Sequence, residues 1–191
     1  MSGKIYLVGD DGELLTMQEE PYEAEALLQR LLAEYPDLLA GDQMRPSAPR
    51  RWLLVSRELS VPDDESEKAR WSLDHLFIDQ EGIPTLVEVK RSSNTQIRRE
   101  VVGQMLDYAA NGTNYWSLDH ITSAFDRRCE RDGLDPDDAI GVFLGDNTEW
   151  EASGFWQAVK TNLQAGRVRL VFVADRIPSE LRRIIEFLNE Q

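Results

Sequence analysis

The sequence predicts an α/β protein in which helices cover a mixed, partly parallel β-sheet. Three observations favour this class: alternating segments of strand length, helical apolar periods between them, and Gly or Pro at the boundaries. In the second half of the chain, strands and helices alternate at the spacing of βαβ units, which bury both faces of a sheet. The 191 residues are enough for one domain with one sizeable core.

The first 20 residues are expected to form a separate β-hairpin, because two short apolar runs flank the sequence DDG at residues 10–12. This hairpin, residues 1–20, is interpreted as an appendage or a dimer edge, and residues 21–191 as the main domain. The main domain begins with a helix that ends near Tyr35, since Pro36 disfavours helical backbone before it. Its apolar face consists of Ala24, Leu27, Leu28, Leu31 and Leu32.

The remaining elements follow from apolar periodicity and turn residues. A strand is centred on residues 52–57, and the polar segment 61–70 is expected to be a loop. Later in the chain, the pattern predicts a turn at 111–116, a helix at 117–133, strands at 140–144 and 168–175, and helices at 149–166 and 179–191. Three aromatic residues are assigned to packing rather than to base stacking: Trp150, Phe155 and Trp156.

The centre of the chain predicts a second β-hairpin, formed by residues 73–79 and 85–90 around a turn with Gly and Pro. If the turn centres on Glu81, paired residue numbers add up to 162. Asp74 then lies opposite Glu88, with Cβ atoms about 5 Å apart, and Lys90 shares the face of Glu88. Two facing carboxylates destabilise a sheet unless a positive charge lies between them, and an oxygen-ligated divalent cation would supply that charge.

An aspartate, a spacer and the triplet Glu88-Val89-Lys90 resemble the motif of the PD-(D/E)xK nucleases, the restriction-endonuclease-like superfamily. The proline usually written before the aspartate is absent, and Leu73 stands in its place. An isolated ExK triplet also occurs on the exposed face of ordinary edge strands, so the motif depends on its context. The resemblance implies a restriction-endonuclease-like mixed β-sheet flanked by helices, with an αβββαβ core after the N-terminal β-hairpin.

The context is the helix that follows the triplet. Gln104 and Tyr108 lie four residues apart on one stripe and form a QxxxY pair. This pair is similar to that of the RecB-type branch of the superfamily, in which the two side chains lie beside the metal site. A helix with a core tyrosine and an incidental glutamine is the simpler alternative. The candidates for the N-cap of this helix are Ser92, Ser93, Asn94 and Thr95.

The resemblance implies a hydrolase that cleaves phosphodiester bonds of DNA with Mg²⁺ or Mn²⁺. The metal ligands would be Asp74, Glu88 and the carbonyl of Val89. Lys90 would orient the attacking water or stabilise the developing charge, while Gln104 and Tyr108 position the site. In the superfamily, the helix before the sheet often has an acid that reaches the site. Glu25 is predicted for that role and Glu34 is the second choice; an exposed glutamate that is only solvated is the alternative.

The formal net charge of -14 is the main objection to a nucleic-acid substrate, because phosphate binding normally needs a basic surface. The charges are unevenly distributed, however: residues 10–25 contain seven acids and no Lys or Arg, whereas residues 90–99 contain four basic residues and no acid. A solvated helix start is the alternative explanation of the basic run. The residues predicted to contact DNA are Arg91, Arg98, Arg99 and Arg70.

Two other functions remain open. The first is a catalytically inactive nuclease-fold module that binds nucleic acid or a protein partner, and the acidic composition favours it. The second is a structural protein with an accidental Glu-Val-Lys triplet. The lone Cys129 excludes a disulfide framework or a cysteine zinc cluster within one chain. His75 and His120 lack the spacing of a metal-binding motif, so both are expected to be structural.

The sequence also bounds location and assembly. No apolar run reaches the length of a membrane span and the N-terminus lacks a signal-peptide pattern, so a cytoplasmic protein without membrane partners is expected. Cleavage of both DNA strands would suit a homodimer. The chain looks like the N-terminal part of longer bacterial proteins, so longer homologues are expected to have a further C-terminal domain.

Overall fold

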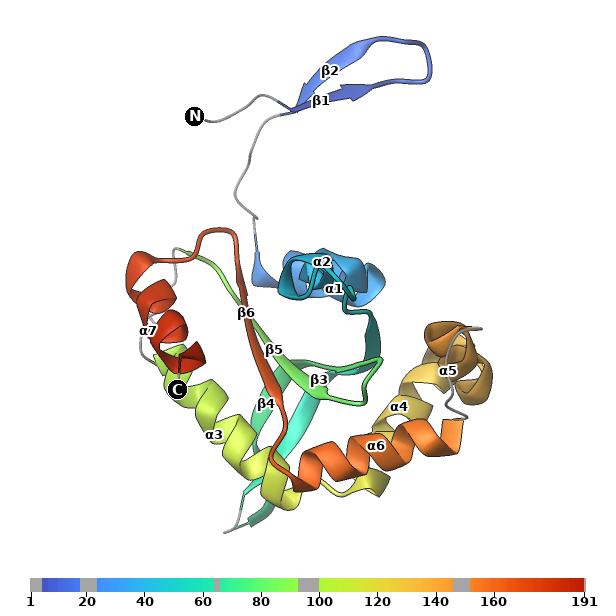
Figure 1. Cartoon of the computed structure of the whole chain (residues 1–191), viewed down its shortest axis with the longest axis vertical. Coiled ribbons are helices and arrows are strands. Elements are labelled where there is room, and N and C mark those ends of the chain that lie inside the picture. Colours follow the sequence, from blue (N-terminus) through green and yellow to red (C-terminus); the bar gives the residue numbers. More distant parts are fainter. Residues whose placement is uncertain (1–4, 18–23, 64–65, 93–99, 146–151, 191) are drawn as a thin grey trace.

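A four-stranded mixed sheet lies at the centre of the protein (Figure 1). The computed structural model describes residues 5–17, 24–63, 66–92, 100–145 and 152–190, apart from the side chains of 60–63 and 66–71. The strands, in their spatial order, are β3 (Trp52–Asp63), β4 (Ser66–Asp79), β5 (Pro84–Lys90) and β6 (Arg169–Ala174). β3, β4 and β5 form an antiparallel meander, and β6 pairs parallel to β5. The predicted mixed sheet is therefore confirmed.

The β4–β5 hairpin has the predicted register. Its turn is fixed by Asp79, whose Oδ1 accepts hydrogen bonds from the N–H groups of Glu81 at 2.9 Å and Ile83 at 3.0 Å. Gly82 adopts a φ of 73° in this turn, a conformation that favours glycine. In every recorded pair the residue numbers add up to 162, and the pairs are His75 with Val87, Leu76 with Leu86, Phe77 with Thr85, and Ile78 with Pro84.

Helices cover both faces of the sheet (Figure 1). One face packs against α1 (Glu25–Glu34) and the 3-10 turn η1 (Pro36–Leu39), which the short helix α2 (Gly41–Met44) follows. On the other face lie α3 (Glu100–Tyr115), α4 (Leu118–Asp132), α5 (Pro136–Leu144), α6 (Ala152–Gln164) and α7 (Ser179–Asn189). Alternation along β5 separates the two cores, because Leu86 packs beneath the second group while Val87 and Val89 pack beneath α1.

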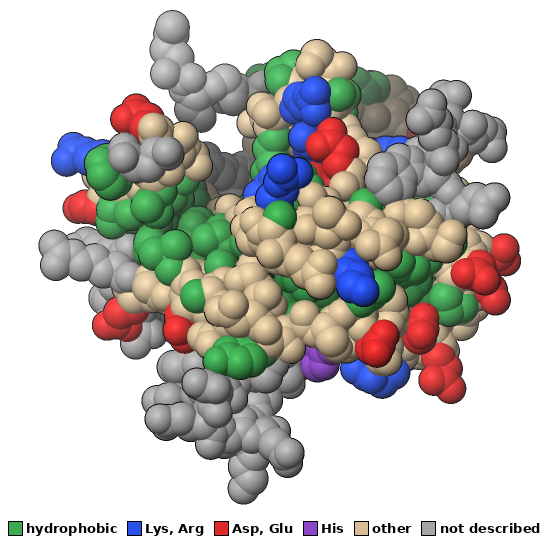
Figure 2. Space-filling view, turned by 60° about the horizontal axis from the view of Figure 1, so that its bottom comes forward, with side chains coloured by type: hydrophobic (Ala, Val, Ile, Leu, Met, Phe, Trp, Pro, Cys, Tyr) green, Lys and Arg blue, Asp and Glu red, His purple; other side chains and the backbone are tan. Residues whose placement is uncertain are grey.

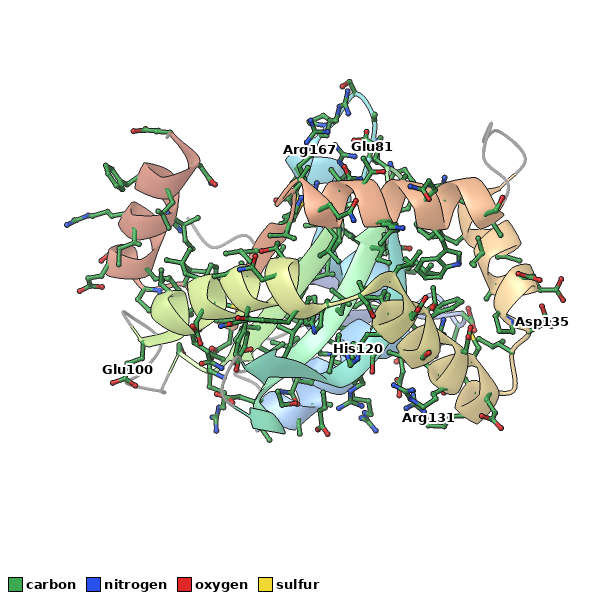
Figure 3. The ribbon with its side chains drawn as sticks, turned by 90° about the horizontal axis from the view of Figure 1, so that it is seen from below. Glu81, Glu100, His120, Arg131, Asp135 and Arg167 are labelled. Carbon is green, nitrogen blue, oxygen red and sulfur yellow. The ribbon has the colours of Figure 1, made fainter. Side chains whose placement is uncertain are left out.

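The predicted strand at 140–144 is wrong, because these residues belong to helix α5. The sequence before them explains the difference: Asp135 caps the helix by accepting hydrogen bonds from the N–H groups of Asp137 at 2.9 Å and Asp138 at 3.0 Å. Pro136 occupies the first turn, where its missing N–H costs nothing. Figure 3 shows Asp135 at the start of α5. This cap, and not the apolar run that follows it, determines the secondary structure.

Two predicted connections are also regular structure. The segment 61–70 is expected to be a loop, but its described residues, 61–63 and 66–70, extend the hairpin of β3 and β4, with Val61 paired to Trp71 and Asp63 to Ser66. The predicted turn at 111–116 is mostly helical, because α3 continues to Tyr115. The predicted helix ends at Tyr35 and Gly133 are confirmed, and Gly133 has the left-handed φ of 70° that a helix C-terminus favours.

The N-terminal hairpin is present as β1 (Ile5–Val8) and β2 (Leu14–Met17), which form a two-stranded sheet of their own. In Figure 1 this hairpin stands apart from the central sheet. Among the helices that the structure describes, none combines the length and the hydropathy needed to cross a membrane.

Candidate active site

The candidate site lies where the ladder between β4 and β5 ends. The last recorded pair is His75 with Val87, so Asp74 and Glu88 are the next residues on each strand. The predicted pair of Asp74 with Glu88 is not part of this ladder. Instead, the carboxylate Oδ2 of Asp74 accepts a hydrogen bond from the N–H of Val89 at 2.8 Å. The Asp74 side chain is therefore fixed directly against the backbone of the Glu-Val-Lys triplet.

Glu88 is the most buried acid of the site, with 2% of its surface exposed. Its Oε1 accepts a hydrogen bond from Lys90 Nζ at 2.6 Å and another from Gln104 Nε2 at 3.2 Å. Its Oε2 is equally buried and accepts no hydrogen bond from a described side chain, although the backbone N–H of Asp74 lies close enough to favour the ionised carboxylate. A buried carboxylate oxygen without a partner is costly, so this atom identifies a position that a cation or a water would stabilise.

The electrostatics of the site follow from this burial. Burial raises the pKa of Glu88, and the nearby charge of Asp74 raises it further, although Lys90 opposes both effects. Burial alone would lower the pKa of Lys90, but its hydrogen bond and charge interaction with Glu88 outweigh burial, so the pKa is raised. Lys90 is therefore a fixed ammonium group beside two carboxylates.

Helix α3 contributes the predicted glutamine and tyrosine. Gln104 and Tyr108 are one helical turn apart, and Gln104 Nε2 donates hydrogen bonds to both the Tyr108 hydroxyl and Glu88 Oε1. The Tyr108 hydroxyl donates to the carbonyl of Ser72 at 3.3 Å, and burial raises its pKa. The QxxxY pair therefore connects the helix to the carboxylate of Glu88 and to β4.

Helix α1 approaches the site from the opposite side of the sheet. Glu25 Oε1 accepts a hydrogen bond from the N–H of Arg91 at 2.9 Å, so the predicted acid lies beside the end of the triplet. Glu34, the second choice, lies at the other end of the helix, is largely exposed, and has Arg30 at 4.0 Å. The preference for Glu25 over Glu34 thus agrees with the position of the two residues.

Gln29 is a site residue that the sequence reasoning missed. Its Nε2 donates a hydrogen bond to Asp74 Oδ1 at 2.8 Å, and its backbone carbonyl lies 2.8 Å from His75 Nε2. Both oxygens of Asp74 are therefore hydrogen-bonded. The spacing contained a signal, because Gln29 follows Glu25 by four residues and is a polar residue within the run LLQRLL. His75 is buried and its pKa is lowered mainly by that burial, which agrees with a structural role.

Asp74 and Glu88 are the acids of the site that could hold a divalent cation. Among the described residues, no group of three or more His, Cys, Asp and Glu could bind a metal. Mg²⁺, however, is commonly bound through one or two carboxylates with water completing an octahedron. Asp74, Glu88 and the backbone of Val89 meet at the end of the ladder, and the unpartnered Glu88 Oε2 provides a ligand atom.

The predicted basic residues are only partly described. Arg91 is half-buried and joined to Glu25 through its backbone. Arg98 and Arg99 lie outside the described residues, as do the N-cap candidates Ser93, Asn94 and Thr95 and the side chain of Arg70. The remaining N-cap candidate, Ser92, binds Asp175 instead, through its N–H at 2.6 Å and its hydroxyl at 2.9 Å. This contact joins the carboxyl ends of β5 and β6 beside the site.

Comparison with known proteins finds no matching family model, no similar curated protein and no similar solved structure.

Proposed function

We propose that this protein is a divalent-metal-dependent phosphodiesterase that hydrolyses DNA, built on a restriction-endonuclease-like fold. One observation supports this most directly: Asp74 and Glu88 adjoin at the end of a strand ladder, and Glu88 Oε2 is buried without a side-chain hydrogen-bond partner among the described residues. The order of the elements also supports it. The succession α1, β3, β4, β5, α3 and β6 corresponds to an αβββαβ core, with three helices inserted before the last strand.

Asp74, Glu88 and the Val89 carbonyl would bind Mg²⁺ or Mn²⁺. A bound divalent cation would polarise the scissile phosphate and lower the pKa of a water ligand. Asp74 is oriented for this role by two donors, Gln29 Nε2 and the N–H of Val89, each at 2.8 Å. Glu88 is oriented by Gln104, which is itself fixed by Tyr108.

Lys90 provides the positive charge of the reaction centre. Its raised pKa keeps the ammonium group protonated at neutral pH, so its role is to stabilise developing negative charge and to orient a water rather than to accept a proton. Its side chain is 18% exposed, whereas that of Glu88 is 2% exposed. Lys90 therefore lies between the buried acid and the solvent from which a phosphate would approach.

The DNA contacts would come from the basic run that follows the triplet, with Arg91 as its described member and Arg98 and Arg99 as further predicted contacts. Arg70, on β4, is the remaining candidate. The four basic residues of 90–99 have no acid among them in the sequence, so the net charge of -14 is unevenly distributed along the chain.

A plasmid-nicking assay with Mg²⁺ and Mn²⁺, paired with calorimetric metal titration, tests the proposal. Glu88→Gln should abolish metal binding and lower cleavage about 100-fold or more, because even partners of metal ligands contribute 10- to 100-fold. Lys90→Ala should abolish cleavage while the metal still binds. Glu100→Gln is the matched control, since Glu100 is exposed at the first turn of α3 and should be silent. Cleavage that survives Glu88→Gln would refute the proposal.

A second candidate is an inactive nuclease-fold module that binds nucleic acid or a protein partner. The ion pair between Lys90 and Glu88 at 2.6 Å favours it, because this contact neutralises the acid without a metal. The same two assays distinguish the candidates. A module would show neither cleavage with any divalent metal nor heat of metal binding, yet would retain its fold and its partner.

A further inference from the structure

The N-terminal hairpin is apolar on both of its faces. Seven of the eight residues in β1 and β2 are large hydrophobic residues, and each has at least half of its surface exposed: Ile5 70%, Tyr6 51%, Leu7 54%, Val8 65%, Leu14 67%, Leu15 53% and Met17 52%. An isolated two-stranded hairpin is at best marginally stable in water, and a contiguous exposed apolar surface commonly marks an interaction site. The hairpin therefore requires an apolar surface that covers it.

A matching surface lies along β6, the edge strand of the central sheet. Among the described strands, none pairs with the outer edge of β6, and all six of its residues are only half-buried. Beside this edge is a groove of about 560 Å³ between β6, α3 and α7, lined by Leu106, Leu170, Phe172, Ile185 and Leu188. Figure 2 shows hydrophobic side chains gathered on the side of the molecule where α7 lies. An unpaired strand edge beside an apolar groove is suited to accept a further strand.

The charges of the hairpin and the groove are complementary. The hairpin turn contains Asp10, Asp11 and Glu13, and residues 10–25 include no Lys or Arg. The groove is lined at the start of β6 by Arg167 and Arg169. Arg169 is engaged by Asp79 at 3.0 Å, whereas Arg167 is exposed in the turn before the strand. Figure 3 shows Arg167 at the same end of the molecule as Glu81.

We propose that the hairpin of one copy docks against β6 and into the groove of a second copy, so that two chains form a dimer by exchanging their N-terminal hairpins. A second copy is the occupant because the hairpin stands apart from the sheet of its own chain, with its apolar residues exposed. Each chain has both an acidic, apolar hairpin and a basic, apolar groove. In a closed two-fold dimer, the hairpin of each chain therefore occupies the groove of the other. This inference is independent of the proposed nuclease activity.

Cross-linking between two separate variants tests the exchange. The lone native Cys129 is buried, so new surface cysteines are the only accessible thiols. Leu7→Cys is mixed with Leu188→Cys and treated with a short bismaleimide, and covalent dimers that contain one chain of each variant are expected. Dimers of Leu7→Cys alone would show that hairpins pair with each other. An internal cross-link in a chain with both changes, without dimers in the mixture, would show docking within one chain; either result overturns the proposal.

Light scattering provides the second measurement. The full chain should have the mass of a dimer, and removal of residues 1–17 should give a folded monomer; a monomeric full chain contradicts the proposal. Arg167→Glu should weaken the dimer by about 4-fold to 25-fold, because the change removes one exposed ion pair, worth about twofold to fivefold, from each of the two equivalent contacts. Asp10→Lys with Asp11→Lys in the same chain should restore it. Arg131→Glu, an exposed change on α4, is the control that should leave the dimer constant unchanged.

Discussion

The two ends of the β4–β5 hairpin each contain a buried acid, but the two acids differ in how their charges are compensated. At the turn, Asp79 is fully buried, and its Oδ1 accepts two backbone N–H groups. Its Oδ2 lies 3.0 Å from Arg169 and 3.3 Å from Arg50. At the open end, Glu88 is 2% exposed, and among the described residues only its Oε1 accepts side-chain hydrogen bonds.

The difference separates an architectural acid from a candidate functional one. Two arginines and two backbone N–H groups compensate the single negative charge of Asp79, so this acid needs no ligand. Glu88 shares one ammonium group with the nearby Asp74, and its pKa is raised by burial and by that second carboxylate. Burial alone therefore does not distinguish the two acids; the charges and donors around each of them do.

The largest expected effect is loss of stability at the turn. Asp79→Ala leaves Arg50 and Arg169 without their shared carboxylate and removes the acceptor of two turn N–H groups. We expect the free energy of unfolding to fall by about 3 kcal/mol or more, the cost of breaking a buried ion pair from one side. Urea denaturation measures it. A loss below about 1 kcal/mol would show that Asp79 is not the organising acid of the turn.

A smaller loss is expected at Asp74. Asp74→Asn replaces one of the two carboxylate oxygens by an NH2 group, which cannot accept a hydrogen bond. Either Gln29 Nε2 or the N–H of Val89 then loses its acceptor. The metal-free protein should therefore lose about 1 to 3 kcal/mol of stability, the cost of leaving one buried polar group unpaired. Gln29→Met, which removes the side-chain donor, should recover part of that loss in the double variant. An unchanged melting temperature in Asp74→Asn would contradict these hydrogen bonds.

Local sequence patterns correctly predicted those features that depend only on residues close together in the sequence. The register of the hairpin followed from one turn centre, and the Gln104–Tyr108 pair from helical spacing. The prediction of a strand at 140–144 was wrong because the period of a short apolar run does not distinguish a strand from a helix. The N-cap at Asp135 favours the helix that the structure shows. Gln29 lies 45 residues from Asp74, and their contact depends on how α1 packs against the sheet, which no local pattern encodes.

Glu88 should respond differently from both aspartates. Glu88→Gln removes a charge that burial disfavours, while its amide oxygen still accepts from Lys90 or Gln104. The two effects oppose each other, so the metal-free free energy of unfolding should change by less than about 1 kcal/mol. Chemical denaturation with and without Mn²⁺ measures it. A loss as large as that of Asp79→Ala would make Glu88 architectural as well, and the contrast between the two ends would disappear.

The smallest expected effect is the pH dependence of the stability difference between the parent protein and Glu88→Gln. The pKa of Glu88 is raised above its ordinary value of 4.5, so the folded state binds its proton more tightly than the unfolded state. The stability that this group contributes is therefore fully present below pH 4.5 and is lost as pH rises through the folded-state pKa. Lys90 remains protonated throughout this window, because its pKa is raised from the ordinary value of 10.5, so it adds no slope.

Gln has no titrating proton, so comparison of the parent with Glu88→Gln isolates this term while most other groups cancel. Between about pH 4 and pH 8, the parent should lose stability relative to the variant as pH rises, and the difference should level off once Glu88 is ionised in both states. Added Mn²⁺ should reverse the trend in the parent alone, since the metal binds the ionised carboxylate. If the parent instead gains stability relative to the variant as pH rises in the absence of metal, Lys90 and Gln104 fully compensate Glu88. Its open Oε2 would then give no reason to place a cation at this end of the hairpin.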